Sequence, residues 1–431
     1  MYPNLYYAFK DLFGIELSAL RFINSFGFFV AIAFLLAAFI LVKELKRKER
    51  SGLLQAKEVK IVVGKPASIT EMLLNAVLGF ILGYKFVGLL LADESQTADP
   101  QQFMFSSAGN WTAGLILAAV FAGVKWYEKN RSKTAVPEER TVRIWPSDRV
   151  GDLVIYAALF GFLGAKIFHN LENWDEFSKN PIEALLSFSG LTFYGGLICA
   201  GIAIYTYARR HNIGFKHLCD SIAPALMLAY AVGRIGCQVS GDGDWGVLNS
   251  AYVYSVQEEK VVKSDSATFR EAIQQHGNYY MQEFGTSSPD SVHKRSFTAP
   301  SWLPTWMVAY TYPHNVINQG TTIKGCIDDQ YCKQLPSPVF PTPFYETVMG
   351  LILFAFLWAI RKRLATPGQL FSVYLIVNGV ERFLIERIRV NTTYSIFGFH
   401  PTQAQLISAS LVIVGVGLYI FFTTRAKKAQ K

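Results

Sequence analysis

The chain has 431 residues, of which 51% are hydrophobic and only 17% are charged, with a formal net charge of +9. Charged residues normally make up about a quarter of a soluble domain, so this chain has too little charge to cover a soluble globule. The mean hydropathy of +0.23 excludes a disordered chain, and the lack of a Gly-X-Y period excludes a collagen-like one. The composition therefore indicates a membrane protein.

The apolar residues gather into runs of membrane length. The first run, residues 22–42, has no charge over 21 positions, which as a helix matches the thickness of a bilayer core. The sequence predicts nine spans in all: 22–42, 72–91, 111–124, 151–168, 184–208, 221–239, 344–360, 368–385 and 404–424. The run 111–124 is short for a crossing, so a buried or re-entrant helix is its alternative. The predicted fold class is an all-α polytopic membrane protein.

Lys and Arg gather after every odd-numbered run, for example at Lys43–Arg50 and at Arg361–Arg363. Because cytoplasmic loops carry the excess of these residues, the N-terminus is predicted outside and the C-terminus in the cytoplasm. The positive net charge then needs no nucleic-acid partner. The first run lacks a basic stretch before it and a small-residue cleavage site, which favours a membrane anchor over a removable signal peptide.

A long polar stretch, residues 240–340, interrupts this pattern and is predicted to lie outside the membrane as an irregular extracytoplasmic subdomain. It contains Cys326 and Cys332, which form either a disulfide in an oxidising compartment or two free thiols. The other cysteines lie in or beside apolar runs and are predicted to be buried as small hydrophobic residues. They are Cys199, Cys219 and Cys237.

Ionisable residues inside the apolar runs are candidates for function, because a charge at membrane depth costs about 2.5–3.5 kcal/mol and must face the bundle interior. These residues are Lys85, Lys166, Arg234, Glu346, Glu381, Arg382 and Glu386. Snorkelling toward the interface is the favoured interpretation of the two lysines. A purely structural ion pair is the alternative for Arg382 and Glu386, which share one helical face.

Four motifs surround these residues. The stretch AYAVGRIGCQVSGDGDWG (229–246) ends a span at Arg234 and continues into a turn of small and acidic residues. A forked guanidinium there would lie at the level of phosphate headgroups, with a simple interface anchor as the alternative. The others are SGLTFYGGLICAG (189–201), PTPFYE (341–346) and VNGVERFLIERIRVN (377–391), the last followed by HPTQAQ (400–405). The chain has no CxxC, HExxH, Walker A or GxGxxG motif, so nothing supports zinc, nucleotide or dinucleotide chemistry.

In this order the motifs resemble those of prolipoprotein diacylglyceryl transferases, bacterial inner-membrane enzymes that attach a lipid to lipoprotein precursors. GRIGCQVSGDGDWG resembles the family signature GRxGNFxNGExxG, and FYGG resembles its HGG element. PTPFYE resembles PSQLYE, and ERFLIERIR resembles FRFxxExxR. The resemblance implies a multi-pass protein of the cell inner membrane, with a core of seven spans and an inserted helix pair.

The resemblance divides the chain into five regions: an N-terminal span (1–50), the inserted helix pair and a cytoplasmic loop (51–149), core spans with the YGG and GRIG motifs (150–246), an enlarged extracytoplasmic insert (247–340) and C-terminal core spans (341–431). Four positions depart from the family pattern. Cys237 replaces an Asn, Asp242 takes the acidic position, Tyr194 replaces the His, and Phe26 replaces a Tyr of the first span. A mechanism that needs that His as base is therefore in doubt.

The implied reaction joins the thiol of a lipobox cysteine to the diacylglyceryl group of phosphatidylglycerol and releases glycerol phosphate. Such a reaction needs a deprotonated thiol and a stabilised phosphate leaving group. The residues that the resemblance assigns to catalysis are Arg234, Arg382, Tyr194, Glu346 and Glu386. Those that it assigns to the phosphatidylglycerol headgroup are Arg234, Gly233, Gly236, Ser240, Asp242, Arg389 and His400.

In this scheme the arginines bind the phosphate, the glutamates orient the arginines, and Tyr194 occupies the position of the family His. His169 and His400 lie near outer span ends and could accept the thiol proton, but an ordinary surface histidine is the favoured interpretation of each. The implied partners are phosphatidylglycerol, other membrane lipids and prolipoprotein signal peptides with a lipobox cysteine. No metal, cofactor or nucleic acid is implied.

Two other classes of function remain open. A secondary transporter would also use interior charges, but it should show paired repeats around a midplane site. The one weak internal similarity, 79–86 with 161–168, excludes the charged late spans. A lipid-binding scaffold built around the insert would tolerate loss of the intramembrane arginines, whereas a transferase would not.

Overall fold

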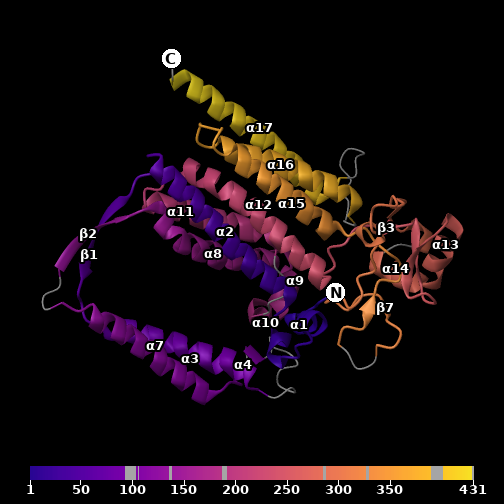
Figure 1. The fold of residues 1–431 in the computed structure, drawn as a ribbon, viewed down its shortest axis with the longest axis horizontal. Coiled ribbons are helices and arrows are strands. Elements are labelled where there is room, and N and C mark those ends of the chain that lie inside the picture. Colours follow the sequence, from indigo (N-terminus) through magenta and orange to yellow (C-terminus); the bar gives the residue numbers. More distant parts are fainter. Residues whose placement is uncertain are drawn as a thin grey trace. The chain divides into compact units, whose positions relative to one another are not determined.

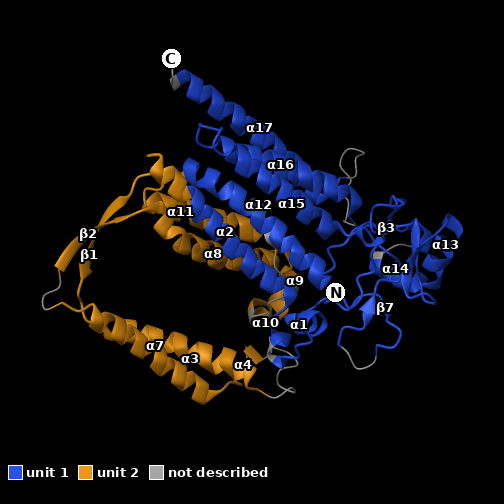
Figure 2. Ribbon diagram, viewed as in Figure 1, with its two compact units in different colours: residues 1–44, 216–431 blue, residues 45–215 orange. Residues whose placement is uncertain are grey.

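The computed structural model describes residues 1–92, 103–104, 106–134, 138–186, 192–284, 288–326, 330–389 and 401–429 (Figure 1). The chain is mainly helical, which agrees with the predicted class. It forms two compact units, coloured separately in Figure 2. The first unit contains residues 1–44 and 216–431, and the second contains residues 45–215.

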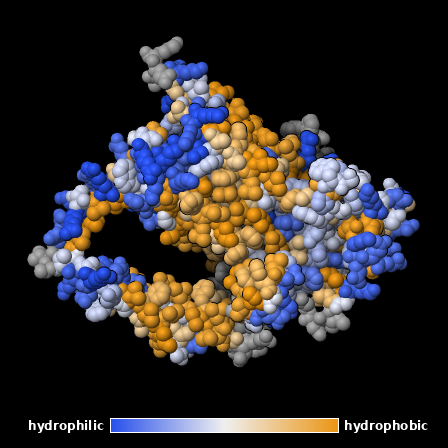
Figure 3. Space-filling view, in the orientation of Figure 1, coloured by the Kyte–Doolittle hydropathy of each residue, from blue (hydrophilic) through white to orange (hydrophobic). Residues whose placement is uncertain are grey.

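Six helical stretches in the described parts of the chain are long and apolar enough to cross a membrane. They are α2 (Ser25–Arg50), Ile69–Leu90, Pro146–Glu172, α12 (Phe215–Ser240), α15 (Thr342–Ile360) and Gln403–Lys428 within α17 (Gln403–Ala429). Each coincides with a predicted run, so the prediction of a polytopic membrane protein is confirmed. On the face shown in Figure 3, hydrophobic residues cover much of the surface over the helices, as segments in contact with lipid require.

Three further helices lie at the remaining predicted runs: α7 (Trp111–Arg131), α11 (Phe193–Arg210) and α16 (Gln369–Ile385). α7 is longer than the apolar run 111–124, because the polar residues after that run continue the helix. Its 21 residues span about 31 Å, which is enough to cross a bilayer core.

The prediction of one span over 184–208 is wrong in its first part. Among the described residues, the short helix α10 (Pro181–Leu186) and α11 are separate elements. Thr192 precedes α11 with an extended backbone, φ −86° and ψ 115°, which is the conformation of a residue that starts a new helix. α11 alone therefore represents the fifth predicted run.

The second unit contains two helix pairs and a two-stranded antiparallel sheet. Its elements are β1 (Lys57–Val63), α3 (Ile69–Ile81), the π-helical stretch Leu82–Val87, α4 (Gly88–Leu90), α7, β2 (Glu138–Ile144), the 3₁₀ turn Pro146–Arg149, α8 (Val150–Glu172), α9 (Trp174–Lys179), α10 and α11. α3 packs against α7, α8 packs against α11, and β1 pairs with β2. A Cβ on Gly195 would lie 2.6 Å from the carbonyl oxygen of Gly164, so this glycine of the YGG motif lets α11 and α8 approach closely.

Lys85 and Lys166 are the two lysines of this unit that lie inside predicted spans, and snorkelling stays a prediction for both. The ammonium of Lys85 binds the backbone carbonyl oxygens of Phe103, Ser106 and Ala108 at 2.5–3.1 Å. Lys166, on α8, is buried within the unit with 4% of its surface exposed. Backbone acceptors therefore satisfy the charge of Lys85, an arrangement that residue spacing in a sequence does not reveal.

The first unit combines helices from the start of the chain with helices from its second half. Its helical elements are α1 (Leu5–Phe13), the 3₁₀ turn Ser18–Phe22, α2 up to Glu44, α12, α15, α16 and α17. α16 packs against α15 and α17. The carboxylate of Asp220, on α12, accepts hydrogen bonds from the backbone amides of Gly368 (2.8 Å) and Phe371 (2.9 Å) at the start of α16. A carboxylate at a helix N-terminus is favourable, and this one ties α12 to α16.

The insert is a small subdomain of the first unit with its own hydrophobic core. Its elements are β3 (Leu248–Asn249), β4 (Tyr252–Ser255), β5 (Lys260–Lys263), α13 (Ser266–Gln275), α14 (Gly277–Phe284), the 3₁₀ turn Pro289–Ser291, β6 (Lys294–Arg295), the 3₁₀ turn Thr305–Met307, β7 (Thr321–Thr322) and β8 (Lys333–Gln334). Buried residues from along its length, including Leu248, Phe269, Tyr280 and Val339, form one cluster. The predicted irregular subdomain is thus partly ordered into short paired strands and two helices.

The cysteines follow the predictions in part. Cys326 and Cys332 form a disulfide in the insert, which decides between the two alternatives. Cys237 is buried as predicted, whereas Cys199 and Cys219 are only half-buried.

Candidate functional site

Three of the four motifs meet in the first unit, where α12 and α16 end and α15 begins. Backbone hydrogen bonds join their flanking segments: the amide of Gly246 donates to Phe340 O and the amide of Val247 donates to Ile388 O, both at 2.8 Å. A Cβ on Gly246 would lie 2.6 Å from the carbonyl oxygen of Ile388. This last glycine of the first motif therefore allows the close approach that brings the three segments together.

Glu346 lies at the centre of this meeting point, on the second turn of α15, and its side chain is fully buried. Its two carboxylate oxygens pair with arginines from two other helices. Oε2 lies 3.1 Å from Nε of Arg234, on α12, and Oε1 accepts a hydrogen bond of 3.0 Å from Nη1 of Arg382, on α16. The two arginines that the sequence singles out are thus brought together on one carboxylate.

Arg382 pairs with a second carboxylate on its own segment. Its Nη2 lies 3.3 Å from Oε2 of Glu386, one helical turn further along. Glu386 is buried as well. Because a planar guanidinium between two fixed carboxylates has little freedom to rotate, the pairing holds Arg382 in one orientation.

Asp244 forms a second bridge between arginines. Its Oδ2 pairs with Arg234, and its Oδ1 accepts a hydrogen bond of 2.6 Å from Nη2 of Arg389. Although burial opposes the charge, the guanidinium groups of Arg389 and Arg234 lower the pKa of Asp244 to about 2. The sequence motif pointed to Asp242 in the same acidic turn, whereas it is Asp244 that pairs with the arginines.

The cluster balances three guanidinium groups against three carboxylates, those of Glu346, Asp244 and Glu386. The guanidinium group of Arg389 keeps a spare hydrogen-bond donor. Nε of Arg389 is buried and makes no hydrogen bond to any described residue. An anion that enters the cluster can therefore bind a preorganised donor without displacing every internal ion pair.

Tyr230 and Glu381 form a further pair beside these arginines. The hydroxyl of Tyr230 donates to Oε1 of Glu381 at 3.1 Å, and the Tyr230 ring faces the guanidinium of Arg234 with Cζ 5.5 Å from its centroid. Glu381 is 4% exposed, and within the described residues it forms no ion pair with an arginine or lysine. The sequence marks Glu381 as a functional candidate because it lies inside an apolar run, but it does not indicate a role for this residue.

The predicted headgroup residues on α12 have different surroundings. Gly233 has open space where a Cβ would lie, whereas a Cβ on Gly236 would lie 3.1 Å from the Cβ of Phe29. Gly236 therefore lets α12 pack closely on α2. Ser240 is fully buried at the end of α12, and its carbonyl accepts a hydrogen bond from the amide of Val316 in the insert.

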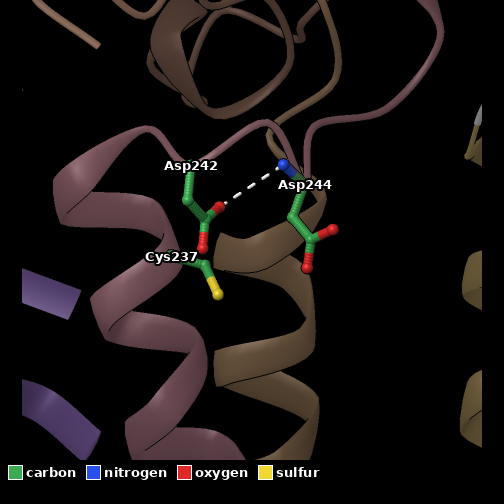
Figure 4. Close-up of side chains that lie close together, drawn as sticks. All are labelled: Cys237, Asp242 and Asp244. Atoms are coloured by element: carbon green, nitrogen blue, oxygen red, sulfur yellow. Dashed lines mark hydrogen bonds between the residues drawn. The ribbon is translucent and has the colours of Figure 1, made fainter. Parts of the chain in front are cut away.

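Cys237, Asp242 and Asp244 converge beneath the turn that follows α12 (Figure 4). The amide of Asp244 donates to Oδ1 of Asp242 at 3.4 Å, and burial raises the pKa of Asp242. The three ligand atoms lie within 4.8 Å of one another, a spacing that suits a metal ion. Both oxygens of Asp244 already pair with guanidinium groups, which repel a cation. The donor set therefore fits a metal poorly.

Three other residues that the sequence singled out are Tyr194, His169 and His400. Tyr194 lies on α11 and His169 on α8, both in the second unit. Nδ1 of His169 lies 3.3 Å from the side-chain amide of Asn173. His400 lies outside the described residues.

Comparison with known proteins gives one consistent result. A model of the prolipoprotein diacylglyceryl transferase family matches residues 106–421. The phosphatidylglycerol–prolipoprotein diacylglyceryl transferase of Lysinibacillus sphaericus (strain C3-41) is 26% identical over 294 residues, which cover 68% of this chain and 84% of the relative. The protein of the same name from Shouchella clausii (strain KSM-K16) is 23% identical over 312 residues, or 72% of this chain and 85% of the relative. That from Dehalococcoides mccartyi (strain ATCC BAA-2266) is 26% identical over 284 residues, or 65% and 81%.

Proposed function

The chain belongs to the prolipoprotein diacylglyceryl transferase family, and we propose that it transfers the diacylglyceryl group of phosphatidylglycerol to the thiol of a lipobox cysteine in prolipoproteins. The observation that carries this proposal is the buried carboxylate of Glu346, which pairs with both Arg234 and Arg382. Two fixed guanidinium groups beside the ends of membrane-length helices are what a phospholipid substrate with an anionic headgroup requires.

In the proposed reaction the cysteine sulfur forms a bond to the terminal glycerol carbon of the diacylglyceryl group. The bond between that carbon and the phosphate oxygen breaks, and its electron pair stays on the oxygen. Glycerol phosphate leaves, the product is a thioether, and the thiol proton passes to a base. A free thiol has a pKa of about 8.5, so this proton must be removed for fast attack at neutral pH.

The arginines stabilise the departing phosphate. Negative charge grows on the bridging oxygen as the carbon–oxygen bond breaks, and guanidinium groups that are already oriented lower the energy of that state. Glu346, Glu386 and Asp244 supply the orientation, because each carboxylate pairs with at least one of the arginines. Arg389 contributes its spare Nε donor.

We assign the thiol proton to Glu381, with Tyr230 as its hydrogen-bonded neighbour. Glu346, Glu386 and Asp244 are engaged by arginines, whereas Glu381 pairs with a neutral hydroxyl and so keeps a carboxylate free to take up a proton. Glu381 also occupies the position of the first Phe in the family motif FRFxxExxR. A carboxylate at this position is consistent with the replacement of the family His by Tyr194.

The proposed topology has nine spans in the bacterial inner membrane, with the N-terminus and the insert outside and the C-terminus in the cytoplasm. Its support is the basic residues in the last turns of α2, α7, α11 and α17. A disulfide in the insert agrees with an oxidising compartment. In this topology the arginine cluster lies near the outer leaflet, where both membrane-anchored substrates can reach it.

The proposal is tested by incubating the purified protein with labelled phosphatidylglycerol and a lipobox peptide, followed by mass spectrometry of the peptide. The expected product carries a diacylglyceryl group on the cysteine, and a Cys→Ser peptide gives none. Binding of phosphatidylglycerol without any thioether product would instead favour a lipid-binding scaffold.

A further inference from the structure

A cavity of about 300 Å³ lies in the first unit, where the chain that leaves α12 meets the insert. Its lining includes Asp244 and Arg389, which also belong to the arginine cluster. The rest of the lining comes mainly from the insert and includes Tyr279 and Glu283, on α14, and Gln319. The cavity is therefore continuous with the cluster, and the insert provides most of its wall.

We propose that this cavity binds the residues that follow the acceptor cysteine in the substrate, which rests on the transferase function proposed above. A prolipoprotein signal peptide enters the site from the membrane, so the chain after the cysteine leads outward. The insert has no membrane-length helix among its described residues and lies next to the cluster, so it is the part of the protein that this segment meets.

The chemistry of the wall favours a peptide over a second phosphate. Arg389 is the cationic group of the wall, and Asp244 already neutralises it at 2.6 Å. The carboxylate of Glu283 adds negative charge, which repels an anion. The phenol of Tyr279 and the amide of Gln319 can donate to and accept from uncharged groups such as a peptide backbone.

The size of the cavity points to a short segment. A volume of about 300 Å³ is at the lower end of the range for ligand pockets, so it suits a few small residues rather than a folded domain. Tyr279, Glu283 and Gln319 all lie within 247–340, the region that is enlarged relative to the family pattern. The enlarged insert would thus select substrates by the residues next to the modified cysteine.

The first test compares two lipobox peptides, one that ends at the cysteine amide and one that continues for several residues. Gln319→Ala should raise KM for the longer peptide about 2- to 10-fold, the effect of one lost hydrogen bond, with little change in kcat. The KM for the shorter peptide should not change. Gln274→Ala, an exposed amide on α13 outside the cavity, is the matched control and should behave as wild type with both peptides. Equal effects of Gln319→Ala on the two peptides would overturn the proposal.

A second measurement does not depend on turnover. A photoreactive residue placed directly after the cysteine should cross-link to α14 or to the segment around Gln319, and excess peptide should compete. Cross-links confined to other regions would overturn the proposal. If the protein cross-links as expected but forms no thioether, this result contradicts the proposed reaction but supports the proposed binding site.

Discussion

Glu346 and Arg382 lie on different helices, yet Oε1 of Glu346 is 3.0 Å from Nη1 of Arg382. The same carboxylate pairs with Arg234 from a third helix, and it has no exposed surface. A charge in this position is stable only while its partners are present. Glu346 is therefore expected to hold α12, α15 and α16 together and to orient both arginines for the substrate.

Replacement of Glu346 should show both roles. Glu346→Gln is expected to reduce the free energy of unfolding by about 3–5 kcal/mol, because it removes the buried carboxylate that Arg234 and Arg382 share and breaks two buried ion pairs at once. Thermal unfolding in a fixed detergent measures the change. The control is Glu128→Gln, which breaks an exposed pair with Lys125 and should cost at most about 1 kcal/mol. The double variant Glu346→Gln, Arg382→Gln should lose less than the sum of the single losses, and strictly additive losses would contradict the coupling.

Replacement of Glu381 should slow transfer in a way that depends on pH. Glu381→Gln removes the proposed proton acceptor, so kcat should fall at neutral pH with little change in the KM for phosphatidylglycerol. As the pH rises through the thiol pKa of about 8.5, the substrate ionises without help and the defect should shrink. Rates measured from pH 6 to about 9.5 with one lipobox peptide provide the test. A defect of constant size over this range would show that Glu381 does not take the proton.

Asp244 should make the fold sensitive to acid. Its pKa of about 2 in the folded protein lies below the ordinary value of 3.8, so its ionisation stabilises the fold. This contribution is complete above pH of about 4 and is lost as the pH falls toward about 2, where the folded form is protonated as well. Asp244→Asn should therefore be less stable than wild type at pH 6, and the difference should narrow in acid. Unfolding curves of both proteins across this range measure it, and a difference that widens in acid would contradict the assignment.

The helices and the central arginines could be predicted from the sequence because each depends on a local property. A run of apolar residues has the length of a bilayer, and a charge within such a run must face inward. This logic found Arg234, Arg382, Glu346 and Glu386, which the structure places in one cluster. The same reasoning does not distinguish Asp242 from Asp244 in the turn after α12. Gly243, with φ +98°, lies between Asp242 and Asp244 in a backbone conformation that no spacing rule predicts, and it is Asp244 that reaches the arginines.

The insert could not be predicted for a different reason. Its strands are two to four residues long, too short for a detectable alternation of polar and apolar residues. Its core joins residues as distant in sequence as Leu248 and Val339, so the fold depends on long-range contacts. The cavity beside the arginine cluster arises only from that folded arrangement.

The most direct test of the account is the transfer rate of Arg234→Lys and Arg382→Lys in the assay with phosphatidylglycerol and a lipobox peptide. Lysine keeps the positive charge but lacks the forked guanidinium group that can bind two acceptors at once. Each variant should therefore lose at least about 100-fold in kcat. Both variants should still insert into the membrane and fold as the wild type does. Arg363→Lys, an exposed arginine after α15, is the control and should keep full activity. Wild-type rates in both site variants would contradict the claim that paired guanidinium groups hold the phosphate.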